Sequence, residues 1–297
     1  MSSLKRIRKD YVLYLMLLPG LIYFTVFHII PIFNMKLAFQ DYKIIGDNTW
    51  VGLKHFETLF SSPAFKDVLL NTIIISTMKI IFIFPIPILL SLLINELRFG
   101  QYRKFIQSVS YLPHFLSWVV IAGIWITLLN PVDGGINTIR NFFHLPSLDF
   151  MTSKEHIRWV LVFSEMWRSA GWDTILYIAA ILKINPALYE AAKMDGASMW
   201  QQMRYVTLPA MISTVITVFI LNLGFFMNAG FDQVFNLMND SVLSVIDILD
   251  TYVYRIGLLN GQYAYATAAS LFKGVIGLVL ILGTHFLSKK LTGKGVW

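Results

Sequence analysis

The stretch EAAKMDGASMWQQMRYVTLP, residues 190–209, decides the fold, because it is polar and mixed in charge yet lies between two long apolar runs. The chain as a whole is 56% hydrophobic and only 14% charged, whereas soluble domains carry roughly 25% charged residues. Apolar runs of about 20 residues recur, which is the length a helix needs to cross a bilayer. We therefore predict an all-α integral membrane protein, since a membrane barrel would show shorter segments of alternating hydrophobicity.

Local signals around this stretch predict two short helices joined by a tight turn. Asn185 and Pro186 are typical of a helix start, with Asn as the cap and Pro at the first helical position. Gly196 can take the left-handed conformation that ends a helix. Ser198 and Gln201 form a capping-box pattern that starts a second helix. The segment 185–209 is therefore predicted to be a helical hairpin held at both ends by membrane spans.

Six spans are expected along the chain. The first follows four basic residues and is predicted to be a retained anchor, because its apolar core is too long for a signal peptide and no small-x-small cleavage site follows. With the N-terminus inside, the inner segments hold 13 Lys and Arg residues and the outer segments 7, which by the positive-inside rule predicts cytoplasmic N- and C-termini and a cytoplasmic hairpin. The expected spans are Val12–Phe33, Val68–Ile94, Ser108–Leu129, Ile157–Leu182, Ala210–Phe231 and Ala264–Leu287.

The chain is expected to divide into an N-terminal part and a core. Residues 1–67 would hold the cytoplasmic tail, the anchor span and an outer amphipathic segment, VGLKHFETLF. Residues 68–297 would form the core of five spans with the hairpin. A second amphipathic segment, SVLSVIDILDTYVYRIGLL, is expected to form short packing helices near the outer surface.

Several function classes are excluded by what the sequence lacks. It has no G-x-x-x-x-G-K-[ST] loop, so it cannot hydrolyse ATP by itself. Its six histidines are scattered without metal-ligand spacing, and it has no cysteine, so no metal site is expected. The net charge of +7 is spread over the ends of the spans rather than gathered in one patch, so nucleic-acid binding is not expected.

The hairpin resembles the EAA loop of ABC importer permeases, whose form is E-A-A-x3-G-x9-I-x-L-P. Glu190-Ala191-Ala192, Gly196 and Leu208-Pro209 stand at the family's positions, and Val206 replaces the Ile. Further stretches, including SYLPHFLSWVVIAGIW and GGINTI, look like the sugar-importer permeases that move oligosaccharides or polysaccharide fragments in Firmicutes. The resemblance covers nearly the whole chain.

This resemblance implies a transport subunit rather than an enzyme. Two cytoplasmic ATPase subunits would bind ATP and Mg, and this chain would carry no cofactor. A second, homologous permease subunit and an extracellular lipid-anchored sugar-binding protein are also implied, with an oligosaccharide as substrate and the cell membrane as location. The residues implied to couple the hairpin to an ATPase are Glu190, Ala191, Ala192, Asp195, Gly196, Ala197, Leu208 and Pro209.

Charges inside the spans are candidates for the substrate path, because they are costly in a membrane and mark function or pairing. Glu165 and Arg168 lie one turn apart, where an i,i+3 pair can form, and Trp172 extends the same face with a ring suited to sugars. The amides of Asn222 and Asn228 would bind hydroxyl groups. Surplus positive charge would tolerate or favour an acidic sugar. The full set of candidates is Lys79, Glu165, Arg168, Trp172, Asn222, Phe226, Asn228 and Lys273.

The same residues are also compatible with purely structural roles and with two other functions. The hairpin could be a plain connection between spans, and the intramembrane charges could be structural pairs. A secondary active transporter of a polar solute is the main alternative, which would require a relay of buried carboxylates. A membrane enzyme is a third, for which the sequence offers no nucleophile and base. A cytoplasmic ATPase bound to the chain would favour the importer over both rivals.

Overall fold

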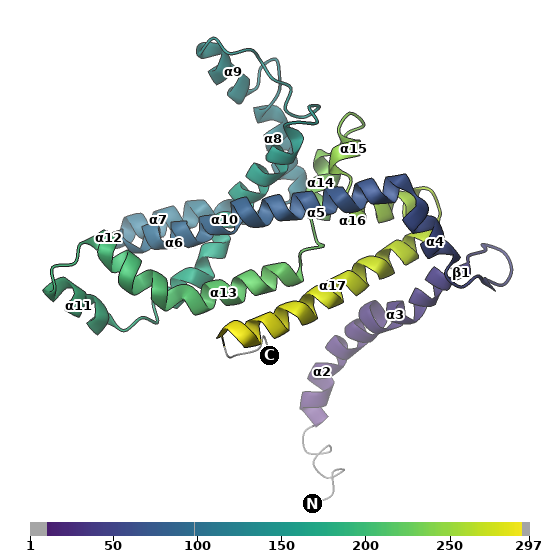
Figure 1. Ribbon diagram of the computed structural model, residues 1–297, viewed down its shortest axis with the longest axis horizontal. Coiled ribbons are helices and arrows are strands. Elements are labelled where there is room, and N and C mark those ends of the chain that lie inside the picture. Colours follow the sequence, from purple (N-terminus) through teal and green to yellow (C-terminus); the bar gives the residue numbers. More distant parts are fainter. Residues whose placement is uncertain (1–10, 98, 293–297) are drawn as a thin grey trace, which may run out of the picture. The chain divides into compact units, whose positions relative to one another are not determined.

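The computed structural model describes residues 11–97 and 99–292. These residues are almost entirely helical, apart from one short two-stranded sheet (Figure 1), so the all-α prediction is confirmed. They form two compact units: residues 11–62 with 253–272, and residues 63–252 with 273–292. The expected division after residue 67 stays a prediction, and it did not group residues 253–272 with the N-terminal part. The expected N-terminal tail, residues 1–10, lies outside the described residues.

The first unit begins with an exposed helical run. It consists of α2 (Tyr11–Phe24), a π-helical turn (Thr25–Ile29), α3 (Ile30–Asn34) and a 3-10 turn (Met35–Phe39). Together they form a run of 29 residues that is long and apolar enough to cross a membrane. No side chain of α2 is buried, and a helix that is apolar on every side is suited to lipid. The expected anchor span is confirmed, with its end at Phe39 rather than Phe33.

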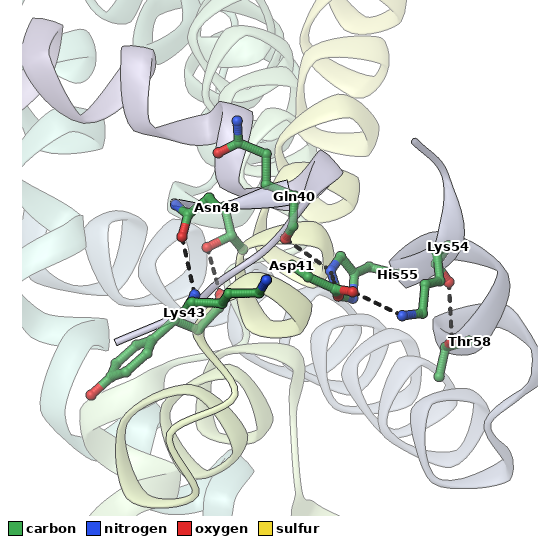
Figure 2. A network of polar contacts seen from close by, with 9 residues as sticks. Gln40, Asp41, Lys43, Asn48, Lys54, His55 and Thr58 are labelled. Atoms are coloured by element: carbon green, nitrogen blue, oxygen red, sulfur yellow. Dashed lines mark hydrogen bonds and ion pairs between the residues drawn. The ribbon is translucent and has the colours of Figure 1, made fainter. Parts of the chain in front are cut away.

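A small β-hairpin follows the anchor helix. β1 (Gln40–Asp41) pairs antiparallel with β2 (Thr49–Trp50), and α4 (Lys54–Ser61) comes next. Lys54 donates a hydrogen bond to Asp41 at 3.0 Å, and the His55 ring nitrogen Nε2 lies 3.0 Å from the Gln40 carbonyl oxygen (Figure 2). The hydrogen bond from Lys54 lowers the pKa of the Asp41 carboxyl below its usual value. These contacts fix the β-hairpin against the start of α4.

The rest of the first unit comes from later in the chain. It contains a π-helical segment (Tyr254–Leu259) and the first part of α17 (Tyr263–Thr292). A Cβ added at Gly257 would lie 2.7 Å from the Cβ of Ala266, so only glycine permits this approach.

The second unit contains the long helices of the core. They are α5 (Pro63–Ile83), α6 (Pro85–Asn95), α7 (Gly100–Tyr111), α8 (Trp118–Leu128), α10 (Ile157–Ile181) and α13 (Leu208–Gly224). Shorter helices connect them: α9 (Gly135–Phe142), α11 (Pro186–Met194), α12 (Met199–Gln202), α14 (Phe231–Leu237), α15 (Leu243–Ile246) and α16 (Leu249–Val253). In Figure 1, α11 and α12 lie at the opposite end of this unit from α14 and α15.

The third expected span, Ser108–Leu129, is corrected by the structure. Its helices are not continuous: α7 and the 3-10 turn Leu112–Phe115 meet α8 at an angle of 103°. Leu116 and Ser117 are extended, and the Ser117 hydroxyl caps α8 by accepting from the Val120 amide. Pro113 lies in the turn before this break, where it has no amide hydrogen to donate. Non-helical backbone at membrane depth requires protein or a water-filled cavity around it.

The fifth span also ends earlier than expected. Its helix stops at Gly224 rather than Phe231, and residues 225–230 form a turn that ends in Gly230 with φ of +99°. The helix of the fourth expected span forms as Ile157–Ile181, one residue shorter than expected, and counts as a span together with Pro186–Met194, at an angle of 76° to it. The second helical run, Pro63–Asn95, is long and apolar enough to count as one span despite the helix boundary before Pro85. Four single helices and two bent pairs among the described residues thus meet the length and hydropathy of spans.

Arg158 of α10 and Asn71 of α5 hold the loop around α15 in place. Arg158 donates to the Val245 carbonyl at 3.0 Å and to the Asn71 side chain at 2.8 Å, and Asn71 donates in turn to the Ser244 carbonyl at 3.1 Å. Residues 244–246 of the amphipathic segment expected near the outer surface therefore pack against α5 and α10, with Ile246 fully buried.

Candidate functional site

The hairpin forms as the sequence predicts. The Asn185 side chain accepts a hydrogen bond from the Ala187 amide at 3.0 Å and caps α11. Gly196 ends this helix with φ of +75°, a conformation that costs side chains energy. Ser198 and Gln201 form the complete capping box of α12. A π-helical turn, Met203–Thr207, then leads into α13, which starts at Leu208.

Side-chain hydrogen bonds link the parts of the hairpin. The Tyr189 hydroxyl lies 2.9 Å from the Thr207 hydroxyl and so joins α11 to the start of the fifth span. Gln202 donates to the Ala197 carbonyl at 2.8 Å. A cleft of about 400 Å³ lies between the hairpin and the end of α6 at Asn95 and Glu96.

The residues expected to meet an ATPase lie on the surface of this chain. Six of them are exposed and the other two, Ala192 and Ala197, are half-buried; the exposed residues are Glu190, Ala191, Asp195, Gly196, Leu208 and Pro209. Large apolar side chains surround them: Met194 is 88% exposed and Trp200 73%. Polar helices that expose such side chains are suited to an interface with another protein.

Besides the helical hairpin, the second unit has a cavity of about 630 Å³. It lies between α5, α6, α10 and α13, and the break before α8 contributes His114 and Trp118 to its wall. Six of the eight expected substrate-path residues line it together: Lys79, Glu165, Arg168, Asn222, Phe226 and Asn228. The structure thus gathers side chains that are up to 149 positions apart, Lys79 and Asn228.

Lys79 is held by three contacts. Its ammonium group donates to the Ala229 carbonyl at 2.6 Å and to the Gln233 side chain at 2.5 Å, and it lies 3.5 Å from the Glu165 carboxylate. The fully buried Gln233 donates in turn to the Leu161 carbonyl at 2.6 Å. The lysine therefore fixes the turn after α13 to both α5 and α10.

Arg168 has a different environment from the one expected. The predicted i,i+3 pair with Glu165 does not form, because Glu165 pairs with Lys79 and the Arg168 guanidinium lies over the Trp118 ring, 5.1 Å from its centre. Among the described residues, no carboxylate lies within 4.0 Å of this guanidinium. Two carboxylates, Glu165 and Asp173, line the cavity with Lys79 and Arg168, so the wall does not have the expected surplus of positive charge.

Trp172 and Lys273 do not line this cavity. The Trp172 ring was expected to stack against sugar, but the His114 ring covers it, with ring centres 4.6 Å apart and an angle of 3° between the planes. Lys273 pairs with Asp250 at 2.5 Å. The structure therefore does not bring these two residues to the other six, and their part in transport stays a prediction.

Sequence reasoning missed several residues of the cavity wall. Ser76 and Asp173 line it, and Trp118 and His114 reach it because the third span is broken. Pro113 was the available signal for the break, since proline disrupts helices. No local pattern identifies Gln233, whose partners lie 69 to 154 positions away.

No group of acidic residues and histidines within residues 11–97 and 99–292 could hold a metal ion. The cavity wall instead combines apolar side chains with a few hydrogen-bonding groups, a composition typical of sites for small molecules.

Comparison with known proteins shows which family the chain resembles. Residues 11–293 match the family described as binding-protein-dependent transport system inner membrane component. The chain is 44% identical over 299 residues to the polygalacturonan/rhamnogalacturonan transport system permease protein YteP of Bacillus subtilis, covering 99% of this chain and 92% of that protein. It is 39% identical to protein LplB of the same organism, covering 100% and 93% of the two chains.

A solved structure has the same fold. A chain of the bacterial alginate ABC transporter, crystallised in complex with an alginate pentasaccharide-bound periplasmic protein, aligns with a TM-score of 0.91 and 39% identity over 99% of both chains. The match extends over nearly the whole sequence, including the hairpin and the cavity. The chain therefore belongs to the binding-protein-dependent inner membrane components and is a multi-pass permease subunit of an ABC importer rather than an enzyme.

Proposed function

We propose that this permease imports oligosaccharides released from polysaccharides, and that it forms one half of their path through the membrane. The observation that carries this proposal is the cavity of about 630 Å³, which has amide, hydroxyl and charged side chains in an otherwise apolar bundle. Such groups suit a solute rich in hydroxyls. The relatives named above support it, since one transports polygalacturonan or rhamnogalacturonan and another alginate.

A second, homologous permease would complete the path. The cavity is only partly enclosed, so this chain alone does not surround a substrate. A membrane path must be shielded from lipid on every side, because a polar solute loses its hydration there at high cost. Residues of the second permease would complete the enclosure.

Two ATPase subunits would drive transport, one through the hairpin of each permease. The exposed Met194 and Trp200 of the hairpin, and its hydrogen bond to the start of α13, support this role. Closure of the ATPases would move α11 and α12, and the hydrogen bond between Tyr189 and Thr207 would carry the movement into α13. ATP and Mg would be bound by the ATPases, and this chain would hold no cofactor.

An extracellular, lipid-anchored binding protein would deliver the oligosaccharide at the outer face. This role requires cytoplasmic N- and C-termini, with residues 130–156 outside and 190–205 inside. An impermeant thiol reagent should label a cysteine introduced at Phe142 but not one at Trp200 in intact cells. The reverse labelling would contradict the orientation and the role of the hairpin.

Reconstitution tests the function itself. The chain, its partner permease, the ATPases and the binding protein in proteoliposomes should take up labelled oligosaccharide when ATP is present on the ATPase side. Vanadate should abolish uptake, and proton uncouplers should leave it unchanged. Uptake that needs a proton gradient and no ATPase would instead indicate a secondary transporter.

A further inference from the structure

Three residues of the cavity wall each have a buried polar atom without a hydrogen-bond partner. The atoms are the Ser76 hydroxyl oxygen, His114 Nδ1 and Arg168 Nε. Ser76 is only 4% exposed. Native proteins leave few buried polar atoms unpaired, and those that remain call for a ligand or water. The three residues come from different elements: α5, the 3-10 turn Leu112–Phe115 and α10.

Within the described part of the wall, Arg168 is the cation that is free to bind a substrate. The other, Lys79, is occupied by Glu165, Gln233 and the Ala229 carbonyl. Arg168 is held in place over the Trp118 ring, yet no carboxylate among the described residues pairs with it. A guanidinium is permanently charged, and its donors match the two oxygens of a carboxylate.

Other groups of the cavity wall are suited to the neutral part of a sugar. The Ser76 hydroxyl can donate and accept, and His114, held flat against Trp172, offers a ring nitrogen. Two carboxylates also line the wall, Glu165 and Asp173. Glu165 is balanced by Lys79, whereas Asp173 lines the same cavity as Arg168 but does not lie within 4.0 Å of its guanidinium. Asp173 can accept hydrogen bonds from sugar hydroxyls while a substrate carboxylate binds Arg168.

We propose that Arg168 determines specificity by binding the carboxylate of a uronate unit in the transported oligosaccharide. This inference rests on the proposed import of oligosaccharides and adds which chemical class is preferred and which residue selects it.

The test compares an acidic with a neutral trisaccharide in the reconstituted transporter. Trigalacturonate and its carboxyl-reduced counterpart are supplied at saturating concentration, and the ratio of their uptake rates is measured. Because the same binding protein serves every variant, its own preference cancels when variants are compared. Arg168→Gln should lower the acidic-to-neutral ratio at least about tenfold, and Arg168→Lys should retain part of it. Lys66→Gln, which removes an exposed cation at the start of α5, should leave the ratio unchanged.

Chemical restoration of the charge separates its effect from any effect on folding. The chain has no cysteine, so Arg168→Cys introduces its single thiol, in a complex whose partners are also free of reactive cysteines. Modification with a cationic aminoethyl thiosulfonate should raise the acidic-to-neutral ratio about tenfold over the unmodified variant. Modification with a neutral methyl thiosulfonate of similar reactivity should not.

The outcomes separate this inference from the proposed function. An unchanged ratio in Arg168→Gln, or equal effects of the two reagents on Arg168→Cys, would overturn the role of Arg168 while import stands. If the unaltered transporter takes up neither trisaccharide nor any other oligosaccharide, the proposed function itself fails.

Discussion

Gly171 of α10 lies directly against the backbone of Ser110 in α7. A Cβ placed on Gly171 would be 2.0 Å from the Ser110 carbonyl oxygen and 2.5 Å from its carbonyl carbon, both far inside van der Waals contact. The neighbouring atoms belong to backbone and cannot rotate away. Small residues allow membrane helices to approach in this way, because packing rather than the hydrophobic effect holds helices together in lipid. This contact positions Arg168 and Trp172, on the same helix, relative to the broken third span.

We expect Gly171→Ala to destabilise the protein by at least about 1–3 kcal/mol, the usual cost of overpacking. Gly123→Ala is the matched control, because nothing lies within 4 Å of a Cβ at Gly123 in α8. Thermal unfolding of the purified permease in detergent measures both. Equal melting temperatures for the two variants would show that α7 and α10 do not meet as described.

Replacing Lys79 by Met should release the turn after α13. The variant leaves the Glu165 carboxylate, the Gln233 side chain and the Ala229 carbonyl without their shared partner. Removing one member of a buried ion pair costs about 3–5 kcal/mol. Adding Glu165→Gln should recover part of this loss, since no unpaired carboxylate then remains. A double-mutant cycle on thermal stability, with Lys66→Met as a surface control, would contradict the network if the two changes were additive.

Replacing Gly196 by Val should uncouple ATP hydrolysis from uptake. The left-handed conformation at Gly196 costs other residues about 1–2 kcal/mol, and a β-branched side chain is among the least tolerated there. Gly196→Asn is the control, because Asn adopts this conformation more readily. Both variants should insert and accept the loaded binding protein, but only Gly196→Asn should transport normally. Full uptake by Gly196→Val would remove the mechanical role of the hairpin.

The contacts between Asp41 and α4 should persist at mildly acidic pH. Because Lys54 lowers the pKa of Asp41 in the folded protein, the carboxylate's contribution is present above the unfolded value of 3.8 and is lost as the pH falls through the lower folded value. Hydrogen exchange at residues 40–55, corrected for the intrinsic pH dependence of exchange, should therefore show equal protection at pH 7 and pH 5. Asp41→Asn should lower protection at both pH values. A loss of protection in the unaltered protein at pH 5 alone would contradict this assignment.

Much of the fold could be predicted from local sequence. The lengths of the apolar runs predict helices because, in lipid, backbone groups must be satisfied within the segment. The hairpin could be predicted nearly residue by residue, since the Asn185 cap, the Gly196 turn and the Ser198 capping box depend on neighbours a few positions away. The presence of charges inside the spans was equally evident.

Only the tertiary structure decided which partners those charges have. Local spacing predicted a pair between Glu165 and Arg168, but Lys79, 86 positions earlier, takes the carboxylate, and Arg168 turns to Trp118. The break at Leu116 and Ser117 brings His114 into the cavity wall, and Pro113 alone did not show that the apolar run would bend there. Helix formation depends on contacts within a few residues, whereas a side chain's partner depends on which helices lie side by side, and packing between distant segments determines that.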